Sequence, residues 1–394
     1  MADLRTLSRK EEEYFFNTYK RLKLLVERGE GCYLFTPDGR KILDMFGGLA
    51  VNLLGYNHPA INKAIGEQVK KYIHLSNFFY QEKPIQLAEK ILSLSGFKKI
   101  FFTNSGTEAA EASIKIIRKY FKGTEKIELI SFTGSFHGRT MGALSLTARK
   151  KYREDYKPLL VDVLNVGYNS IKSLEKNAGE KTAAVFVECL QGEGGVNLIS
   201  KDFADKITEF KNKFGFLLVA DEIQSGVGRT GKLHAFEHFG LKPDLVLLAK
   251  GIGGGLPLGA VLGAESMADV LTPGSHGSTF GGNPVASASG LAVLIELEKG
   301  VMENARKIGE FLISKLVGIK SDYPDKIKDV RGMGLMIGIE LSFDGQIVVE
   351  KMMEQNVLVN CTNGNVIRLL PPLILSENEV KIFIEKFKNT IIRL

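Results

Sequence analysis

The chain has 394 residues, of which 44% are hydrophobic and 25% charged, and its formal net charge is +7. Such a length exceeds the size at which a single hydrophobic core keeps growing, so we expect a large domain and a smaller one. The composition is typical of globular proteins and excludes the disordered and fibrous classes.

The sequence also argues against membrane and disulfide-rich classes. No apolar run reaches the roughly eighteen residues that a membrane-spanning helix needs, and residues 1–13 carry too many charges for a signal peptide, so we expect a cytoplasmic enzyme. Cys32, Cys189 and Cys361 lie far apart without C-x-x-C spacing and predict neither a disulfide framework nor a thiolate metal site. Basic and acidic residues are interleaved, so an anionic small molecule explains the positive charge as well as nucleic acid does.

Apolar runs rich in β-branched or aromatic residues alternate with helical patterns along the chain. The runs that predict strands are residues 100–103, 128–132, 183–187, 216–220, 245–248 and 260–262. Between the first two runs, apolar residues follow the spacing of one helix face, namely Ala109, Ala112, Ile116, Ile117 and Tyr120. This alternation predicts an α/β fold with a mainly parallel central sheet that helices cover on both sides.

Polar residues stand just beyond these predicted strands. They are Asn104, Thr133, Glu188, Asp221 and Lys250. In open α/β sheets, ligands bind outside the carboxyl ends of the strands, so these residues predict the ligand site.

The residues after the first predicted strand suggest a phosphate site. Gly106 and Thr107 open the predicted helix, and amides there would point free donors, backed by the helix dipole, at a bound anion. A Ser/Thr N-cap with a glycine turn explains the same residues without a ligand.

A second loop, residues 135–140, contains an aromatic ring, an imidazole and a guanidinium. Phe136 could stack on a flat ring, and Arg139 could grip a carboxylate through two hydrogen bonds. Considered without its neighbours, the loop is equally typical of a surface.

Asp221 and Lys250 point to a particular cofactor. Lys250 follows the strand 245–248 and precedes the glycine-rich run 251–255. A lysine amine condenses with a carbonyl only when it is held in place and partly desolvated, which a strand end in a glycine-lined crevice provides. Asp221 would pair with a protonated ring nitrogen and make the ring an electron sink, so together the two residues predict pyridoxal 5'-phosphate. On these two positions alone, a lysine lying along a strand edge and a solvated turn aspartate explain the pattern equally well.

Two motifs between these residues belong to other chemistries. Residues 226–232 match G-x-x-x-x-G-K, but Leu233 replaces the hydroxyl residue that binds magnesium in nucleotide hydrolases. Residues 234–238 match H-x-x-E-H, which on a helix sets two imidazoles for zinc and a glutamate base. Because five-residue patterns are common by chance, a zinc peptidase is only a minor alternative, and we expect no metal site.

The character of the chain changes at about residue 299. A helical pattern is followed by predicted strands at residues 335–341, 356–360 and 366–369, and then by a last helix opened by the capping box Ser376-x-x-Glu379. The predicted buried stripe of that helix is Val380, Phe383, Ile384, Phe387 and Ile391.

These patterns predict two domains. Residues 56–298 form the large domain, and residues 299–394 form a small α+β domain to which residues 1–55 contribute. Glu193 and Arg368 lie where the two domains should meet, so we expect them to form an ion pair, since a buried arginine needs a carboxylate partner.

Taken together, several motifs resemble the class III pyridoxal phosphate aminotransferases. They are Ser105-Gly-Thr-Glu108, Phe136-His-Gly-Arg139, Asp221-Glu-Ile-Gln224, Ala249-Lys-Gly251 and Ser278-Thr-Phe-Gly-Gly-Asn-Pro284. Residues 47–59 and 330–335 extend the resemblance to both ends of the chain. The resemblance implies fold type I, pyridoxal 5'-phosphate as cofactor, and a homodimer in which the subunits share the phosphate site.

The resemblance also implies a role for each matching position. Lys250 would bond covalently to the cofactor, Asp221 would pair with the ring nitrogen, and Gln224 would bond the ring hydroxyl. Phe136 would stack on the ring. The other cofactor-binding positions are Ser105, Gly106, Thr107, His137, Glu188, Ser278 and Thr279, the last reaching the phosphate from the other subunit. Substrate would meet Asn52, Arg139, Glu193 and Arg368, with Glu193 shielding Arg368 from the amine donor and releasing it for glutamate.

The implied reaction is ping-pong transfer of an amino group from an ω-amine such as N-acetylornithine to 2-oxoglutarate, as in arginine biosynthesis, with Lys250 moving the proton. Gly48 stands where ornithine-specific relatives carry a tyrosine, which leaves room for an acylated α-amine. Cys189 departs from the family's usual proline and leaves the local backbone open. Ornithine, 4-aminobutyrate and an aminoadipate semialdehyde of lysine biosynthesis remain alternative substrates, and neither nucleic acid nor membrane is an expected partner.

Overall fold

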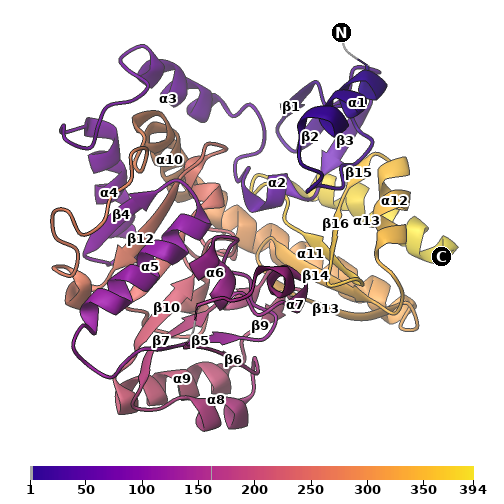
Figure 1. Ribbon diagram of the computed structural model, residues 1–394. Helices are drawn as coiled ribbons and strands as arrows, with labels where there is room; N and C mark the ends of the chain where they lie inside the picture. The colour runs from indigo at the N-terminus through magenta and orange to yellow at the C-terminus, as the bar shows by residue number, and fades with distance from the viewer. Residues whose placement is uncertain (1–2, 161) are drawn as a thin grey trace.

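The computed structural model describes residues 3–160 and 162–394. A large part built on one sheet lies beside a smaller part built on two sheets (Figure 1). The predicted α/β class with a mainly parallel central sheet is confirmed. Among the described residues, no helix is both long enough and apolar enough to cross a bilayer. The predicted domain boundaries stay predictions, and residues 1, 2 and 161, which fall within them, lie outside the described residues.

The central sheet has seven strands. In spatial order they are β4 (Lys99–Thr103), β12 (Gly259–Gly263), β11 (Leu245–Leu248), β10 (Leu217–Asp221), β7 (Thr182–Val187), β5 (Glu128–Phe132) and β6 (Val163–Val166). The strands from β11 to β6 pair in parallel, whereas β12 is antiparallel to both of its neighbours. The carboxyl ends of β10 and β11 therefore lie side by side at one edge, with Asp221 paired in register with Leu247.

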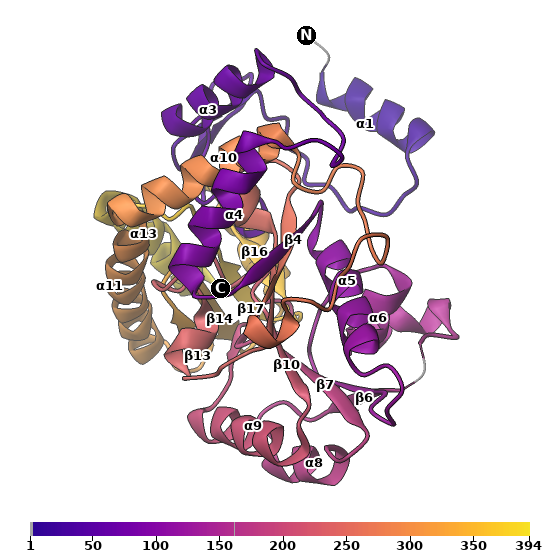
Figure 2. The same ribbon diagram turned by 90° about the vertical axis from the view of Figure 1, so that its left-hand side faces the viewer.

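Helices cover both faces of this sheet. Successive strand residues point to opposite faces, and because both faces carry apolar side chains, each face needs a covering layer. Apolar residues of one face pack against α5 (Gly106–Tyr120) and α6 (Met141–Leu146). The other face packs against α4 (Glu82–Ser95), α8 (Ile171–Asn177), α9 (Lys201–Phe214) and α10 (Pro284–Glu296). Both layers are visible in Figure 2.

Short elements complete the large part. They are α3 (Pro59–Val69), α7 (Lys150–Arg153), β8 (Leu190–Gln191), β9 (Asn197–Leu198), η1 (Glu154–Tyr156), η2 (Ala235–His238), η3 (Lys250–Gly253), η4 (Glu265–Met267) and the π-helical turn η5 (Leu297–Val301).

The smaller part contains an antiparallel sheet packed on helices. Its strands, in order, are β13 (Ile327–Met333), β14 (Met336–Leu341), β17 (Val366–Leu369) and β16 (Asn360–Thr362). Its helices are α11 (Met302–Asp322), α12 (Gln346–Glu354) and α13 (Glu377–Arg393). The predicted capping box at Ser376 is present, and the predicted stripe of α13 is buried except for Ile384, which is half-buried.

The N-terminal strands join the C-terminal residues in a second small sheet. It consists of β1 (Arg28–Glu30), β2 (Tyr33–Phe35), β3 (Lys41–Asp44) and β15 (Val357–Leu358), with β3 parallel to β15. The turn α2 (Gly47–Ala50) then leads toward the large part. Helix α1 (Leu4–Tyr14) has no buried residue and stands apart from the rest of the chain in Figure 2.

Two glycines of α11 give a test of how the smaller part is packed. Gly309 faces the turn between β13 and β14, and a Cβ there would overlap the backbone of Gly334. Gly318, on the same helix, is exposed with open space around it. We expect Gly309→Ala to destabilise the protein by about 2 kcal/mol through overpacking. Gly318→Ala should stabilise it by about 0.5–1 kcal/mol through helix propensity.

Thermal and urea unfolding of the two variants beside the unmodified protein measure this difference. Equal stability of the two variants would show that α11 does not press against Gly334 in solution.

Candidate active site

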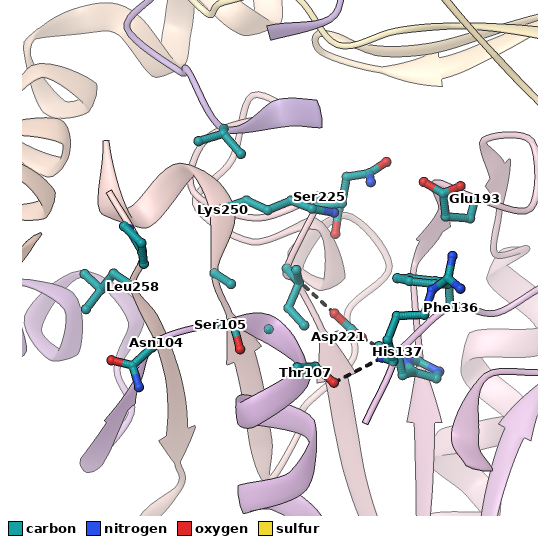
Figure 3. Close-up of a pocket in the computed structure, with 18 of the residues that line it drawn as sticks. Asn104, Ser105, Thr107, Phe136, His137, Glu193, Asp221, Ser225, Lys250 and Leu258 are labelled. Atoms are coloured by element: carbon teal, nitrogen blue, oxygen red, sulfur yellow. Dashed lines mark hydrogen bonds and ion pairs between the residues drawn. The ribbon is translucent and has the colours of Figure 1, made fainter. Parts of the chain in front are cut away.

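A cavity of about 460 Å³ opens at the carboxyl edge of the central sheet, and most of the predicted site residues line it (Figure 3). The predicted residues in its wall are Ser105, Gly106, Thr107, Phe136, His137, Arg139, Glu188, Glu193, Asp221, Gln224 and Lys250. In Figure 3, Ser105 and Thr107 lie at one end of the cavity and Glu193 at the other. The structure therefore brings together residues that the sequence spreads over about 150 positions.

Lys250 enters the cavity from the end of β11, as the first residue of η3. Its φ of 51° is in the left-handed region, which costs a non-glycine residue strain energy and is typical of functional positions. The side chain keeps some accessible surface within the cavity but lies deep in the protein. Burial, and next the positive charge of Arg368, lower the pKa of Lys250 to about 8. A substantial fraction of its amine is therefore neutral and nucleophilic near neutral pH.

Asp221, the last residue of β10, is fixed by two hydrogen bonds. Its Oδ2 lies 2.7 Å from Nδ1 of His137, and its Oδ1 accepts from the amide of Ile223 at 3.1 Å. Burial alone would lower the pKa of His137, but the hydrogen bond and charge of Asp221, with the charge of Glu188, raise it above its ordinary value. The hydrogen bond to His137 also fixes the orientation of the Asp221 carboxylate in the cavity wall.

Helix α5 begins at the opposite end of the cavity, where it can receive an anion. The hydroxyl of Ser105 caps the helix by accepting from the amide of Glu108 at 3.3 Å. Within the described chain, the amides of Gly106 and Thr107 have no hydrogen-bond partner and face the cavity. A Cβ on Gly106 would come within 2.7 Å of Ile223, so only glycine permits this close approach. The arrangement fits a phosphate group.

The loop after β5 supplies an aromatic wall. Phe136 lines the cavity and meets Tyr152 edge-on at 5.8 Å, while the guanidinium of Arg139 lies 3.8 Å from the centre of the Tyr152 ring. Thr107 holds this loop, because its Oγ1 accepts from the amides of Arg139 and Thr140, both at 3.2 Å. Arg139 is exposed at the cavity mouth, where a carboxylate can reach it.

Arg368 comes from β17 of the smaller part and is almost fully buried, with 2% of its surface exposed. Its Nη1 donates to Oε1 of Glu193 at 2.6 Å and to the side-chain oxygen of Gln224 at 3.2 Å, while Nη2 donates to Asn360 at 2.7 Å. Burial alone would raise the pKa of Glu193, but the charge and hydrogen bond of Arg368 lower it. The geometry contains the expected Glu193–Arg368 pair, whose part in substrate binding stays a prediction.

A second buried carboxyl group, Glu188, supports the aromatic wall. Its Oε2 accepts from the amide of Phe136 at 3.1 Å. Burial raises the pKa of Glu188, although the neighbouring charge of His137 opposes the shift. Cys189, next in sequence, is buried, and its carbonyl accepts from the amide of Ile199 at 2.9 Å.

Four predicted residues lie beside the cavity rather than in its wall, and Arg368, which is paired with Glu193 of the wall, is one of them. Asn52 approaches Gly255 of the wall, and Ser278 accepts a hydrogen bond from Asn104 of the wall at 3.1 Å. Thr279 is exposed on the loop that follows. Asn104, which the sequence placed at the expected ligand edge, lines the cavity. The predictions assigned no role to the remaining wall residues, whose side chains are apolar or small: Val51, Gly138, Leu190, Ile223, Ser225, Ala249, Gly255, Leu256, Pro257 and Leu258.

The two motifs of other chemistries form no site of their own. In the G-x-x-x-x-G-K segment, Lys232 is exposed and donates to the carbonyl of Glu237 at 3.4 Å. His234 precedes the short 3-10 helix η2 and stacks on Phe236, whereas His238 is the last residue of η2 and lies next to Thr230. Residues 3–160 and 162–394 contain no group of three His, Cys, Asp or Glu side chains able to hold a metal ion.

Known proteins agree with this geometry. The model of the family "Aminotransferase class-III" matches residues 14–391. The chain is 43% identical to the acetylornithine aminotransferase of Aquifex aeolicus, covering 93% of this chain and 96% of that protein. It is also 43% identical to that of Clostridium acetobutylicum, over 96% and 99% of the two chains.

Two solved structures extend the comparison to the fold. The ornithine aminotransferase of Toxoplasma gondii superposes with a TM-score of 0.95 at 28% identity, covering 100% of this chain and 96% of that one. The acetylornithine aminotransferase of Elizabethkingia anophelis superposes with a TM-score of 0.87 at 31% identity, covering all of both chains.

The lowered pKa of Lys250 predicts its reactivity. In protein freed of bound small molecules, reductive alkylation of Lys250 by a small aldehyde should increase through a midpoint near pH 8, because only the neutral amine reacts. Ordinary lysines, with a pKa of about 10.4, should still be gaining reactivity well above that pH. Peptide mass spectrometry between pH 6 and 11 follows both classes in one sample. A midpoint for Lys250 at or above the ordinary lysine value would contradict the buried environment described here.

Proposed function

The chain belongs to the class-III aminotransferase family, and on that premise we propose that it moves the ω-amino group of N2-acetylornithine to 2-oxoglutarate. The products are N-acetylglutamate 5-semialdehyde and glutamate, a step of arginine biosynthesis. The observation that carries the proposal is one cavity whose wall contains the Lys250 amine, the Asp221 carboxylate and Glu193, with Arg368 paired to Glu193 directly behind that wall. Full-length relatives named for acetylornithine support the choice of amine donor.

Pyridoxal 5'-phosphate fits the cavity residue by residue. When bound, this cofactor supplies an aldehyde for the amino group and a cationic ring that accepts carbanion electrons. The free amides of Gly106 and Thr107 would hold its phosphate, Phe136 would stack on its ring, and Asp221 would face its ring nitrogen. Lys250 lies between these groups.

Lys250 would also move the proton of the reaction. As a general base, its Nζ would take the proton from the substrate carbon that carries the amino group. As a general acid, the same Nζ would then give that proton to the carbon of the cofactor. A pKa of about 8 suits both directions near neutral pH. The same burial that lowers this pKa excludes water from the exchange.

The two arginines would divide the substrate carboxylates between them. Arg139, at the cavity mouth, would grip the α-carboxylate of the acetylated donor, and Arg368 would bind a carboxylate of 2-oxoglutarate. Glu193 would cover Arg368 while the donor is present. At Gly48, which would carry a tyrosine in ornithine-specific relatives, the nearest atom to a Cβ is Nδ2 of Asn52, and the missing side chain leaves space for the acetyl group.

Ornithine is the second candidate donor, because the T. gondii structure superposes over the whole chain and is named for that amine. 4-Aminobutyrate and a lysine-pathway semialdehyde would use the same cofactor residues. The alternative donors would differ only in the residues that they contact at the substrate end of the cavity.

We further propose that the chain functions as a homodimer through the face around Thr279. Exposed aromatic residues gather there: Phe78, Phe79, Tyr80 and Phe280, with exposures of 95%, 64%, 99% and 58%. Asn77 joins their two segments by donating to the carbonyls of Ser278 and Gly281 at 3.0 and 3.2 Å. An apolar patch of this kind marks a protein interface. Pairing there would bring Thr279 of each subunit toward the phosphate held by the other.

Steady-state assays of the holoenzyme with acetylornithine, ornithine, 4-aminobutyrate and lysine derivatives against 2-oxoglutarate test the reaction. We expect acetylornithine to have the highest kcat/KM, Lys250→Ala to abolish transfer, and Arg368→Ala to raise the KM for 2-oxoglutarate at least tenfold, about 1.4 kcal/mol. Preference for unacetylated ornithine or 4-aminobutyrate would overturn the choice of donor. Unchanged Michaelis constants in Arg368→Ala would remove Arg368 from the binding site.

Sedimentation equilibrium tests the dimer. The double substitution Phe78→Asp and Tyr80→Asp should produce a monomer, because two charges would be buried without partners. Val317→Asp, on an exposed position of α11, is the matched control and should leave the mass unchanged. A dimer that survives the double substitution would place the interface elsewhere.

A further inference from the structure

The carboxylate of Glu193 lies between two guanidinium groups, and only one of them has a role so far. Oε1 of Glu193 lies 2.6 Å from Nη1 of Arg368, and Oε2 lies 3.9 Å from Nη1 of Arg149. Arg149, which follows α6 and caps α7, does not line the active-site cavity. It lines a separate groove of about 790 Å³ on the other side of the Glu193 loop.

The backbone of this loop is held on every side. The carbonyl of Glu193 accepts from Arg149 and, at 2.8 Å, from Thr362 of β16. Two nitrogens of Arg331 donate to the carbonyl of Gly195, at 2.7 and 3.1 Å. The next residue, Val196, is buried at a φ of 56°, a conformation that a β-branched residue keeps only when its surroundings enforce it. The main chain is thus fixed, and the side chain of Glu193 is the part free to move.

For the Glu193 carboxylate, charge pairing favours one position other than that on Arg368. A dicarboxylate that binds Arg368 must displace Glu193, which would then be an ionised group, only 23% exposed, without a partner. Arg149 is 13% exposed, and among residues 3–160 and 162–394 no carboxylate other than Glu193 lies within 4.0 Å of it. A change of side-chain rotamer can convert the 3.9 Å approach into a direct ion pair.

We propose that Arg149 is the positioning residue that accepts the Glu193 carboxylate when a dicarboxylate occupies Arg368. The inference rests on the proposed function and explains how one cavity serves two substrates. With the monocarboxylate amine donor, Glu193 stays on Arg368. With glutamate or 2-oxoglutarate, Glu193 turns to Arg149, so that neither buried charge is left alone.

Substitution of Arg149 by Met tests this role in the holoenzyme. Arg149→Met keeps the length of the apolar stem and removes the charge. We expect the dissociation constant of glutarate, an unreactive dicarboxylate, to rise about tenfold by calorimetry. The KM for glutamate should rise by a similar factor, while the KM for acetylornithine should stay within about twofold.

Two further variants separate this role from others. Thr362→Val removes the other hydrogen bond to the carbonyl of Glu193 without touching its carboxylate, and it should leave both constants nearly unchanged. In a Glu193→Gln background, Arg149→Met should cause no selective loss of glutarate affinity, because no displaced charge needs a partner. An equal loss in that background would show that Arg149 attracts the ligand directly and would overturn the proposal.

The remaining outcomes are also decisive. If Thr362→Val weakened glutarate binding selectively and as much as Arg149→Met does, the effect would be assigned to the loop backbone. If Arg149→Met changed the KM values for glutamate and acetylornithine equally, or changed neither, Arg149 would not be the residue that accepts the displaced Glu193 carboxylate. If the unmodified enzyme converted neither substrate, the proposed function would fail, while glutarate calorimetry would still decide whether Arg149 supports dicarboxylate binding.

Discussion

The site depends on charges that the fold removes from water at one edge of a sheet. Asp221, His137 and Lys250 are carried there by strands β10, β5 and β11 of the central sheet and the loops that follow them, and each is surrounded by protein. A charge in such a place persists only with a partner or with a shifted pKa. Asp221 has His137 as its partner, whereas Lys250 lies beside cationic Arg368 and responds with a lowered pKa. The same desolvation therefore produces an anion in one place and a neutral nucleophile in the other.

The smaller part completes the site through one arginine and is itself tied to the large part by another. Arg368 extends from β17 to Glu193 of the cavity wall, and Arg229 extends from the large part and donates to the carbonyls of Leu335 and Pro371. Both guanidiniums are almost fully buried, so removing either side chain would leave unpaired carbonyl groups between the two parts. Buried arginines thus support the cavity wall and align the two parts through the same kind of contact, which makes the position of Arg368 sensitive to the whole junction.

Sequence patterns located what has a period or a motif and missed what depends on three-dimensional context. The strands at residues 128–132, 245–248 and 366–369 were predicted with the bounds that the structure has, because each is a short, buried apolar run. Strand β13 was missed, since its polar residues interrupt the run, and the short edge strand β6 was missed as well. Residues of four of the motifs line the cavity together, those at 105–108, 136–139, 221–224 and 249–251, whereas Arg149 belongs to no motif and owes its position to the folding of a loop against Glu193.

Rigid backbone and movable charge are combined at two places in this site. Lys250 and Val196 both have a positive φ, which the surrounding structure must enforce at an energetic cost of about 1–3 kcal/mol each. In both places the strained residue fixes the main chain next to a titratable side chain whose pKa is shifted by its surroundings, Lys250 itself in one case and Glu193 in the other. In a flexible loop the backbone would move together with the charged side chain, and the site would discriminate less well between its substrates. With the backbone fixed, only the side chain of Glu193 can respond, and the two positions that we propose for it would correspond to the two kinds of substrate that a ping-pong enzyme must accept in turn.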